Sequence, residues 1–184
     1  MLTPGENADF YLKVAEGIHQ TPQIAANSFI ASHVTMVGDI AIGENSSVWY
    51  QSVIRGDVNN ITIGKGTNIQ DGTVIHVSSI LQGTFIGDYV TVGHQALLHA
   101  CTIGDKAFIG MKACIMDGAT VETGAMVAAN ALVPPGKTVP SGELWAGSPA
   151  RKMRDLTDDD YKIIENSAAH YIEIAKTYLN EGIK

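Results

Sequence analysis

Residues 103–133 read IGDKAF-IGMKAC-IMDGAT-VETGAM-VAANAL-V, an unbroken run of six-residue units. Every unit begins with isoleucine or valine, and every complete unit has alanine four positions later. An amphipathic helix needs an apolar period near 3.6 and a simple strand a period of about 2, so neither alone explains a period of six. The pattern is typical of short strands joined by tight turns, three to each coil of a triangular prism. The aliphatic residue then points inward and the small residue fits the corner.

The same period covers most of the chain before residue 103. It is broken by one five-residue step and by two interruptions, near Val58–Thr62 and Val77–Thr84, which we expect to bulge out as loops. Coils stacked at the spacing of paired strands, about 4.8 Å, would form a column about seven coils tall. Each coil would bury the edge of the next, so the two ends need caps. We therefore predict an all-β solenoid of parallel strands.

The chain is expected to divide into three segments. Residues 1–20 would form an N-terminal strand or cap, residues 21–150 the β-helix, and residues 151–184 a C-terminal helical segment. Thr157 is a good N-cap because three acidic residues, Asp158–Asp160, follow it in the first turn. Apolar residues then recur at helical spacing. This helix would pack along the column or against a neighbouring subunit.

The composition excludes several classes of protein. The 184 residues are 45% apolar and carry a formal charge of −7, which disfavours nucleic acid or an anionic membrane as a partner. The sequence contains no run of 18 apolar residues, so we expect no membrane-spanning helix. The N-terminal residues lack the apolar core of a secretory signal, and the two cysteines, Cys101 and Cys114, do not make a disulfide framework. We expect a cytoplasmic protein.

Three of the six histidines lie in one polar region of this apolar framework. With both interruptions looped out, Ile54, Ile75 and Leu98 occupy one face of three successive coils. The residues that directly follow them should stack as an outward-facing ladder: Arg55, His76 and His99.

A second ladder is expected on another face of the prism. Ile69 and Val92 stack there, and Asp71 and His94 each follow two positions later. Outward side chains on different faces diverge, so His94 should reach a ligand of the first ladder only from a second chain. Three prisms packed side by side would create three such interfaces, which predicts a homotrimer. Three neutral imidazoles around zinc, with an open fourth position, make a hydrolytic or hydration site.

Several motifs give the chain a family resemblance. It resembles the left-handed parallel β-helix proteins built from hexapeptide repeats and, among them, the gamma-class carbonic anhydrases and their bacterial homologues. The left hand is implied by this resemblance, since the general crossover rule favours the opposite hand. The motifs are Val53-Ile54-Arg55-Gly56-Asp57, Asn68-Ile69-Gln70-Asp71-Gly72, Val92-Gly93-His94-Gln95 and Leu98-His99-Ala100-Cys101, together with His76.

The resemblance implies a metal site between subunits. His76 and His99 of one subunit and His94 of the next would bind zinc, with iron(II) or cobalt as alternatives. Metal-bound hydroxide would hydrate carbon dioxide reversibly to bicarbonate. The remaining residues that the resemblance assigns to the site are Arg55 and Asp57, which meet across the interface, Gln70 and Asp71, which contact the metal-bound water, Asn68 nearby, and Tyr171 on the terminal helix.

The chain departs from the family pattern in its acidic groups. Val58 stands where the archetype has a glutamate after the Arg-Gly-Asp triplet, and residues 78–84 contain no acid where the archetype has its proton shuttle. An accessory metal-binding protein with little turnover is therefore one alternative. An acyltransferase is another, because the same scaffold carries enzymes that use one histidine as a base.

Overall fold

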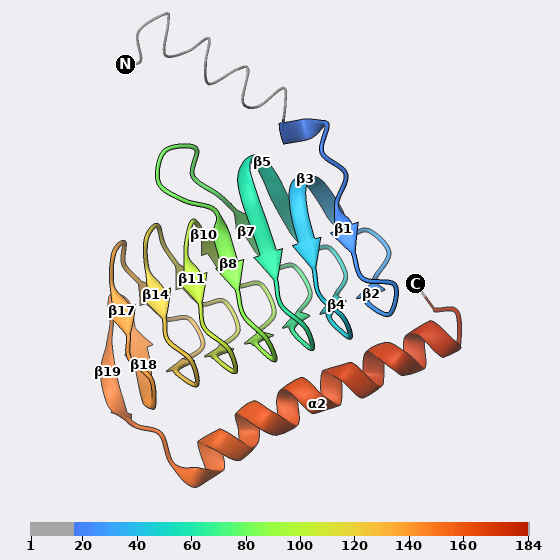
Figure 1. Cartoon of the computed structure of the whole chain (residues 1–184). Coiled ribbons are helices and arrows are strands. Elements are labelled where there is room, and N and C mark those ends of the chain that lie inside the picture. The colour runs from blue at the N-terminus through green and yellow to red at the C-terminus, as the bar shows by residue number, and fades with distance from the viewer. Residues whose placement is uncertain (1–16, 184) are drawn as a thin grey trace, which may run out of the picture.

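The computed structural model describes residues 17–183, which form a parallel β-solenoid with one long helix along its side (Figure 1). This confirms the predicted fold class. The strands are β1 (Gln23–Ile24), β2 (Phe29–Ile30), β3 (Thr35–Ile42), β4 (Ser47–Val48), β5 (Val53–Ile63), β6 (Asn68–Ile69), β7 (Val74–His76), β8 (Thr84–Ile86), β9 (Thr91–Val92), β10 (Leu97–His99), β11 (Thr102–Ile103), β12 (Phe108–Ile109), β13 (Cys114–Ile115), β14 (Thr120–Val121), β15 (Met126–Val127), β16 (Leu132–Val133), β17 (Thr138–Val139), β18 (Glu143–Gly147) and β19 (Ala150–Asp155). The helix is α2 (Asp158–Asn180).

The strands form two continuous sheets around the column. The 8-stranded sheet runs in the order β19-β18-β15-β12-β9-β6-β4-β2. The 11-stranded sheet covers two faces, because β5 turns the corner between them. The first residues of β5 pair with β7, with Val53 opposite Val74. The last residues of β5 pair with β8, with Ile61 opposite Thr84.

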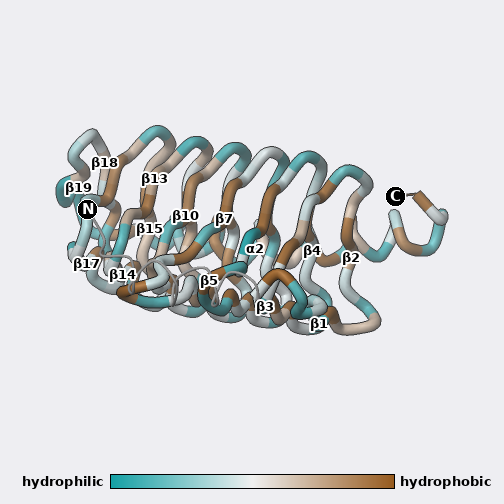
Figure 2. The backbone as a smooth tube through the Cα atoms, turned by 90° about the horizontal axis from the view of Figure 1, so that it is seen from above, coloured by the Kyte–Doolittle hydropathy of each residue, from teal (hydrophilic) through white to brown (hydrophobic). Residues whose placement is uncertain are grey.

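The interior is built by stacking like residues on like. Ile54 pairs with Ile75 and Ile75 with Leu98, and all three side chains are fully buried. The corner alanines are equally inaccessible, as at Ala107 and Ala119. Figure 2 shows the hydrophobic segments recurring at matching positions from coil to coil. Each buried aliphatic side chain contributes about 1.5–3 kcal/mol by leaving water, so the column is stabilised along its whole length.

One of the two expected loops is present and the other is not. Residues 77–83 form a loop between β7 and β8, as predicted. Residues 58–62 instead lie inside β5, so the expectation of a loop there was wrong. The extra residues are absorbed as a register shift against β3: Gly38 pairs with Gly56, but Ile40 pairs with Ile61. Backbone pairing continues on both sides of this bulge.

The helix packs along its own column, which settles the alternative left open by the sequence. Thr157 is the N-cap and forms a capping box with Asp160. The far half of α2 is held by aromatic contacts: the Tyr178 ring lies 5.4 Å from Phe29 and 5.3 Å from Trp49, between ring centroids. These geometries are edge-on, as aromatic pairs prefer.

The two ends of the described chain differ. At the C-terminal end, β18 and β19 form an antiparallel hairpin, and α2 follows after a short connection. At the N-terminal end, residues 17–18 are helical, whereas the expected entry strand or cap around Tyr11 and Val14 lies outside the described residues. Within residues 17–183, no helix is long and apolar enough to cross a membrane.

Stacking predicts a large cost for removing one buried residue in the middle of the column. We expect Leu98→Ala to lower the free energy of unfolding by about 2–5 kcal/mol, because it leaves a cavity between two rigid coils. Leu81→Ala is the matched control, since this side chain is 64% exposed in the loop. It should change the free energy of unfolding by less than about 0.5 kcal/mol. Urea unfolding measures both variants. Equal effects would contradict the stacked core.

Candidate metal centre

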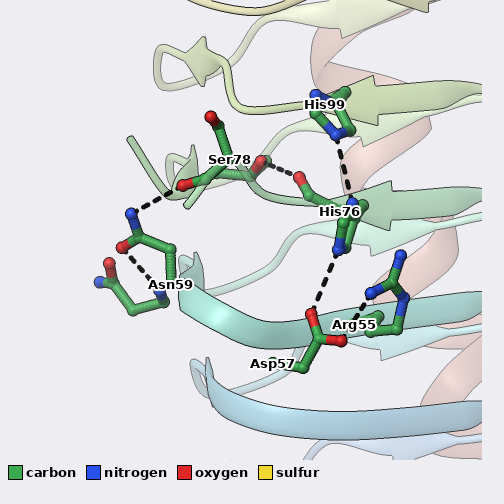
Figure 3. A network of polar contacts seen from close by, with 8 residues as sticks. Arg55, Asp57, Asn59, His76, Ser78 and His99 are labelled. Carbon is green, nitrogen blue, oxygen red and sulfur yellow. Dashed lines mark hydrogen bonds and ion pairs between the residues drawn. The ribbon is translucent and has the colours of Figure 1, made fainter. Parts of the chain in front are cut away.

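The first ladder is formed as the register predicts. Arg55 lies opposite His76 in the β5–β7 pair, and His76 lies opposite His99 in the β7–β10 pair. The two imidazoles face each other, with His76 Nδ1 3.2 Å from His99 Nε2 (Figure 3). Parallel pairing therefore brings together two histidines that are 23 residues apart.

A carboxylate holds each end of this imidazole pair. Asp57 Oδ1 lies 3.2 Å from His76 Nε2, and Asp117 Oδ1 lies 2.6 Å from His99 Nδ1. Arg55 donates to the other oxygen of Asp57 within the same chain, whereas the resemblance implied that these two residues meet across the subunit interface. Figure 3 shows the Arg55, Asp57, His76 and His99 side chains as one continuous chain of contacts.

The surroundings favour an ionised carboxylate next to a neutral ring. Burial raises the pKa of Asp57, but hydrogen bonds from Arg55 and His76 outweigh it and hold that pKa below its ordinary value. Burial is the main cause that lowers the pKa of His76; the positive charge of Arg55 acts in the same direction, and Asp57 opposes both. A neutral imidazole is the form that binds a metal.

The hydrogen bonds also assign the ring protons. An ionised carboxylate only accepts, so His76 carries its proton on Nε2 and His99 carries its proton on Nδ1. The two nitrogens that face each other, His76 Nδ1 and His99 Nε2, are then both lone-pair donors. In this pair of tautomers no N–H is left to join the two rings, and a bound cation would accept both lone pairs.

The spacing of these nitrogens fits zinc. Two nitrogens bound at about 2.0–2.1 Å to a tetrahedral zinc lie roughly 3.3–3.4 Å apart. The observed separation is 3.2 Å. The donor chemistry and the distance thus agree with two of three histidine ligands, and Asp57 and Asp117 are the outer carboxylates that such ligands commonly have.

The second ladder lies on a corner of the prism. His94 Nδ1 is 2.9 Å from Asp71 Oδ2, and both side chains are about two-fifths exposed. Successive corner residues are linked along the column, since the Gln95 N–H donates to the Asp71 carbonyl and the Lys112 N–H to the His94 carbonyl. The Asp71 contact assigns the His94 proton to Nδ1 and leaves Nε2 as a third lone pair.

One chain does not bring the two ladders together. Among residues 17–183, no group of three histidine, cysteine or carboxylate side chains converges on a single metal position. His76 and His99 form one pair of donors on a face of the prism, and His94 stands apart from them on a corner.

The other residues expected at the site lie around the second ladder. Gln70 accepts the His94 backbone N–H on Oε1 at 3.2 Å and donates from Nε2 to Asn68 Oδ1 at 3.0 Å. The Tyr171 ring packs edge-on against Trp49. Burial, and then the negative charge of Asp71, raise the pKa of Tyr171. Tyr171 therefore belongs to the Asp71 side of the molecule.

The sequence analysis missed Asp117. Part of its signal was present, because Ile115 pairs with Leu98 in the next coil of the same face. The residues that follow Ile115 must therefore lie beside His99. The ladder position in the next coil is Met116, and Asp117 lies one residue further along, in the turn after β13, so the six-residue count alone does not find this carboxylate.

Comparison with known proteins places this geometry in a family. No protein-family model matches the chain. The chain is 48% identical over 170 residues to mitochondrial gamma carbonic anhydrase 2 of Arabidopsis thaliana, with 90% of this chain and 61% of that protein aligned. It is also 48% identical over 159 residues to a carbonic anhydrase of Geobacillus kaustophilus, with 86% and 87% aligned. The chain belongs to the gamma-class carbonic anhydrase family.

Coverage differs among these gamma-class relatives. The chain spans 61–66% of the length of three Arabidopsis proteins. Among solved structures, a hexapeptide transferase family protein from Anaplasma phagocytophilum is 46% identical with a TM-score of 0.82, covering 85% of this chain and 92% of that one. A Bacillus cereus structure is 42% identical with a TM-score of 0.85, covering 87% and 92%.

The Asp117 contact makes a prediction about the proton on His99. In metal-free protein at neutral pH, long-range 1H–15N correlation spectra should show His99 protonated on Nδ1, because Asp117 accepts there. Asp117→Ala should shift the ring toward the Nε2-protonated form and weaken zinc binding about 10–100-fold, as loss of an outer carboxylate commonly does.

The control is Asp159→Ala, which removes an exposed carboxylate on α2 that pairs only with Lys162. It should alter neither the His99 spectrum nor the zinc affinity measured by chelator competition. If Asp117→Ala leaves the His99 spectrum unchanged, Asp117 does not fix the ring proton of His99.

Proposed function

We propose that this protein is a zinc-dependent carbonic anhydrase that hydrates carbon dioxide reversibly to bicarbonate at sites shared between subunits of a homotrimer. One observation carries the proposal: two imidazole nitrogens face each other at 3.2 Å, each ring is held by a carboxylate through its other nitrogen, and the third histidine stands apart on a corner. A neighbouring copy brings its His94 to the pair. The cytoplasmic location expected from the sequence stays a prediction.

The chain's own residues have separable tasks in this proposal. Asp57 and Asp117 orient the two imidazoles of one subunit, and Asp71 orients the imidazole that reaches across from the other. When bound, zinc supplies a Lewis acid that lowers the pKa of water to about 7. Gln70 directs one amide hydrogen to Asn68 and retains a second one to position water at the site. Iron(II) or cobalt would also bind the same three imidazoles.

The experiment that tests a shared site uses complementing variants. His76→Ala and His94→Ala should each lose zinc and carbon dioxide hydration, measured by zinc content and stopped-flow assay. When the two variants are co-expressed, a site is intact where a His94→Ala subunit supplies His76 and His99 and its neighbour, a His76→Ala subunit, supplies His94. Random assembly into closed trimers would restore about a quarter of the sites.

Two outcomes would contradict this proposal. A mixture as inactive as either variant would mean that the ligands are not shared between subunits. Wild-type protein with no hydration above buffer after loading with zinc, cobalt or iron(II) would remove the enzymatic function. Zinc uptake with no hydration would favour the accessory metal-binding alternative.

Proton removal makes a second prediction. The loop that follows His76 is held by Asn59, which donates to the Ser78 carbonyl (Figure 3). It is also held by Thr84, which donates to the His76 carbonyl. It carries no acid, and its tip exposes Ile80 and Leu81.

Buffer should therefore accept the proton, so kcat should rise with buffer concentration at constant ionic strength and level off. Introducing an acid at the exposed tip, Leu81→Glu, should raise kcat at low buffer and flatten this dependence. Stopped-flow hydration measures both effects, and Leu81→Gln is the uncharged control. A kcat that does not respond to buffer in wild-type protein would require a shuttle within the chain.

A second candidate is acyl transfer, favoured by the hexapeptide transferase name of a structure 46% identical to this chain. An acetyl-CoA binding assay distinguishes the two functions. A transferase with a single base histidine would keep most of its activity in His94→Ala, whereas the proposed metal enzyme would not.

A further inference from the structure

A chain of hydrogen bonds connects the second ladder with the terminal helix. It begins at the His94 backbone N–H, which donates to Gln70 Oε1 at 3.2 Å. Gln70 Nε2 donates to Asn68 Oδ1 at 3.0 Å, and Asn68 Nδ2 donates to Thr91 Oγ1 at 3.0 Å. Thr91 Oγ1 in turn donates to Ser167 Oγ on α2 at 2.9 Å. Three of these four bonds join residues that are at least 23 positions apart, and Thr91 and Ser167 are separated by 76 residues.

Every bond in this chain has the same direction. Gln70 uses its carbonyl oxygen toward His94, so its amide group must face Asn68. Asn68 accepts on its own oxygen and therefore presents its amide group to Thr91. The Thr91 oxygen is then occupied as an acceptor, and its proton is directed to Ser167. Reversing either side-chain amide would set donor against donor or acceptor against acceptor.

The chain is shielded from water over most of its length. Asn68, Gln70 and Thr91 are 1%, 6% and 2% exposed. Water cannot readily replace a missing partner there, and a buried polar group without a partner is costly. In such surroundings, successive hydrogen bonds also polarise and strengthen one another. Asn68 Nδ2 also lies 3.4 Å from the Val90 carbonyl, and the bond from Thr91 to Ser167 is the part of this network that reaches α2.

Gln70 and His94 border the same groove, with a volume of about 450 Å³. We propose that Ser167 is a positioning residue for this site: as the terminal acceptor, it fixes the Thr91 hydroxyl, and through Asn68 it fixes the Gln70 amide and the His94 backbone. The catalytic part of this inference rests on the proposed function. The positional part does not.

Ser167 is separate from the contacts that dock the helix. The far half of α2 is anchored by Tyr171 and Tyr178 against Trp49. Its near half is anchored by the buried Ile164, which packs with Met126 and Leu144. Removing one hydroxyl between these anchors should leave the helix in place. A test can therefore change the hydrogen-bond chain without undocking α2.

The test compares Ser167→Ala with Ser167→Thr and with Thr177→Ala. Thr177 is the matched control, because its hydroxyl bonds the Glu173 carbonyl on the exposed side of the same helix. In 1H–15N spectra of the whole protein, Ser167→Ala should shift the His94 backbone amide and the side-chain NH2 signals of Gln70 and Asn68. Thr177→Ala should leave these signals unchanged, and Ser167→Thr should return them toward the wild type.

In zinc-loaded enzyme, Ser167→Ala should lower kcat about two- to tenfold, the effect of losing one hydrogen bond, with little change in KM. Ser167→Thr should restore kcat, and Thr177→Ala should not alter it.

Unshifted Gln70 and His94 signals in Ser167→Ala would overturn the proposal. Shifted signals with unchanged kcat in an active enzyme would overturn the catalytic part of it. If the wild-type protein hydrates no carbon dioxide, the proposed function fails, and the spectra alone still decide whether Ser167 sets the orientation of Gln70.

Discussion

The fixed register between stacked coils is the constraint on which the rest of the structure depends. Each coil is hydrogen-bonded to the next in parallel, so residues at equal positions lie directly above one another. Ile54, Ile75 and Leu98 stack inside the prism for this reason. Their successors Arg55 and His76 stack outside it. The same backbone pairing that stabilises the core thus sets the spacing of the functional side chains.

This scaffold gives the imidazoles unusually well-defined orientations. His76, His94 and His99 each have one ring nitrogen on a carboxylate, so each has a single remaining lone pair. Asp57 lies in β5 beside the His76 ring, and Asp117 lies in the turn after β13. These contacts restrict the rotation of each ring. Under the proposed function, the imidazoles would thus be oriented before a metal binds, which would lower the free-energy cost of binding it.

Sequence reasoning reached the ladders because they depend only on register. A side chain's face follows from counting in sixes, and the count remained correct across the loop at residues 77–83. The interruption at residues 58–62 was misjudged, since a count cannot tell an excluded loop from a bulge that keeps its pairing with β3. Asp117 was missed because the ladder position in the next coil is Met116, and Asp117 lies one residue further along, in a turn whose side-chain direction the count does not give.

The position of α2 could not be predicted from the six-residue repeat. Its amphipathic pattern required an apolar surface but did not say which one, and both its own column and a neighbour offered such a surface. The structure resolves this through the aromatic residues Trp49 and Tyr178, whose meeting depends on the shape of the connection after β19. The contact of Thr91 with Ser167 depends on the same connection.

The position of the helix bears on how a shared site is divided within one chain. The first ladder is held by residues of its own strands and the turns beside them. The second ladder lies next to α2. Gln70 and Asn68 are connected to Ser167 through Thr91. The pKa of Tyr171 is raised mainly by burial and also by the negative charge of Asp71. Each subunit would thus supply a rigid pair of ligands on one face and a single ligand on a corner connected to its helix. In the part of the chain that the structure describes, the hydrogen bonds from α2 lead to the His94 backbone and not to His76 or His99. A movement of α2 would therefore act on the corner that carries His94 before it acts on the pair.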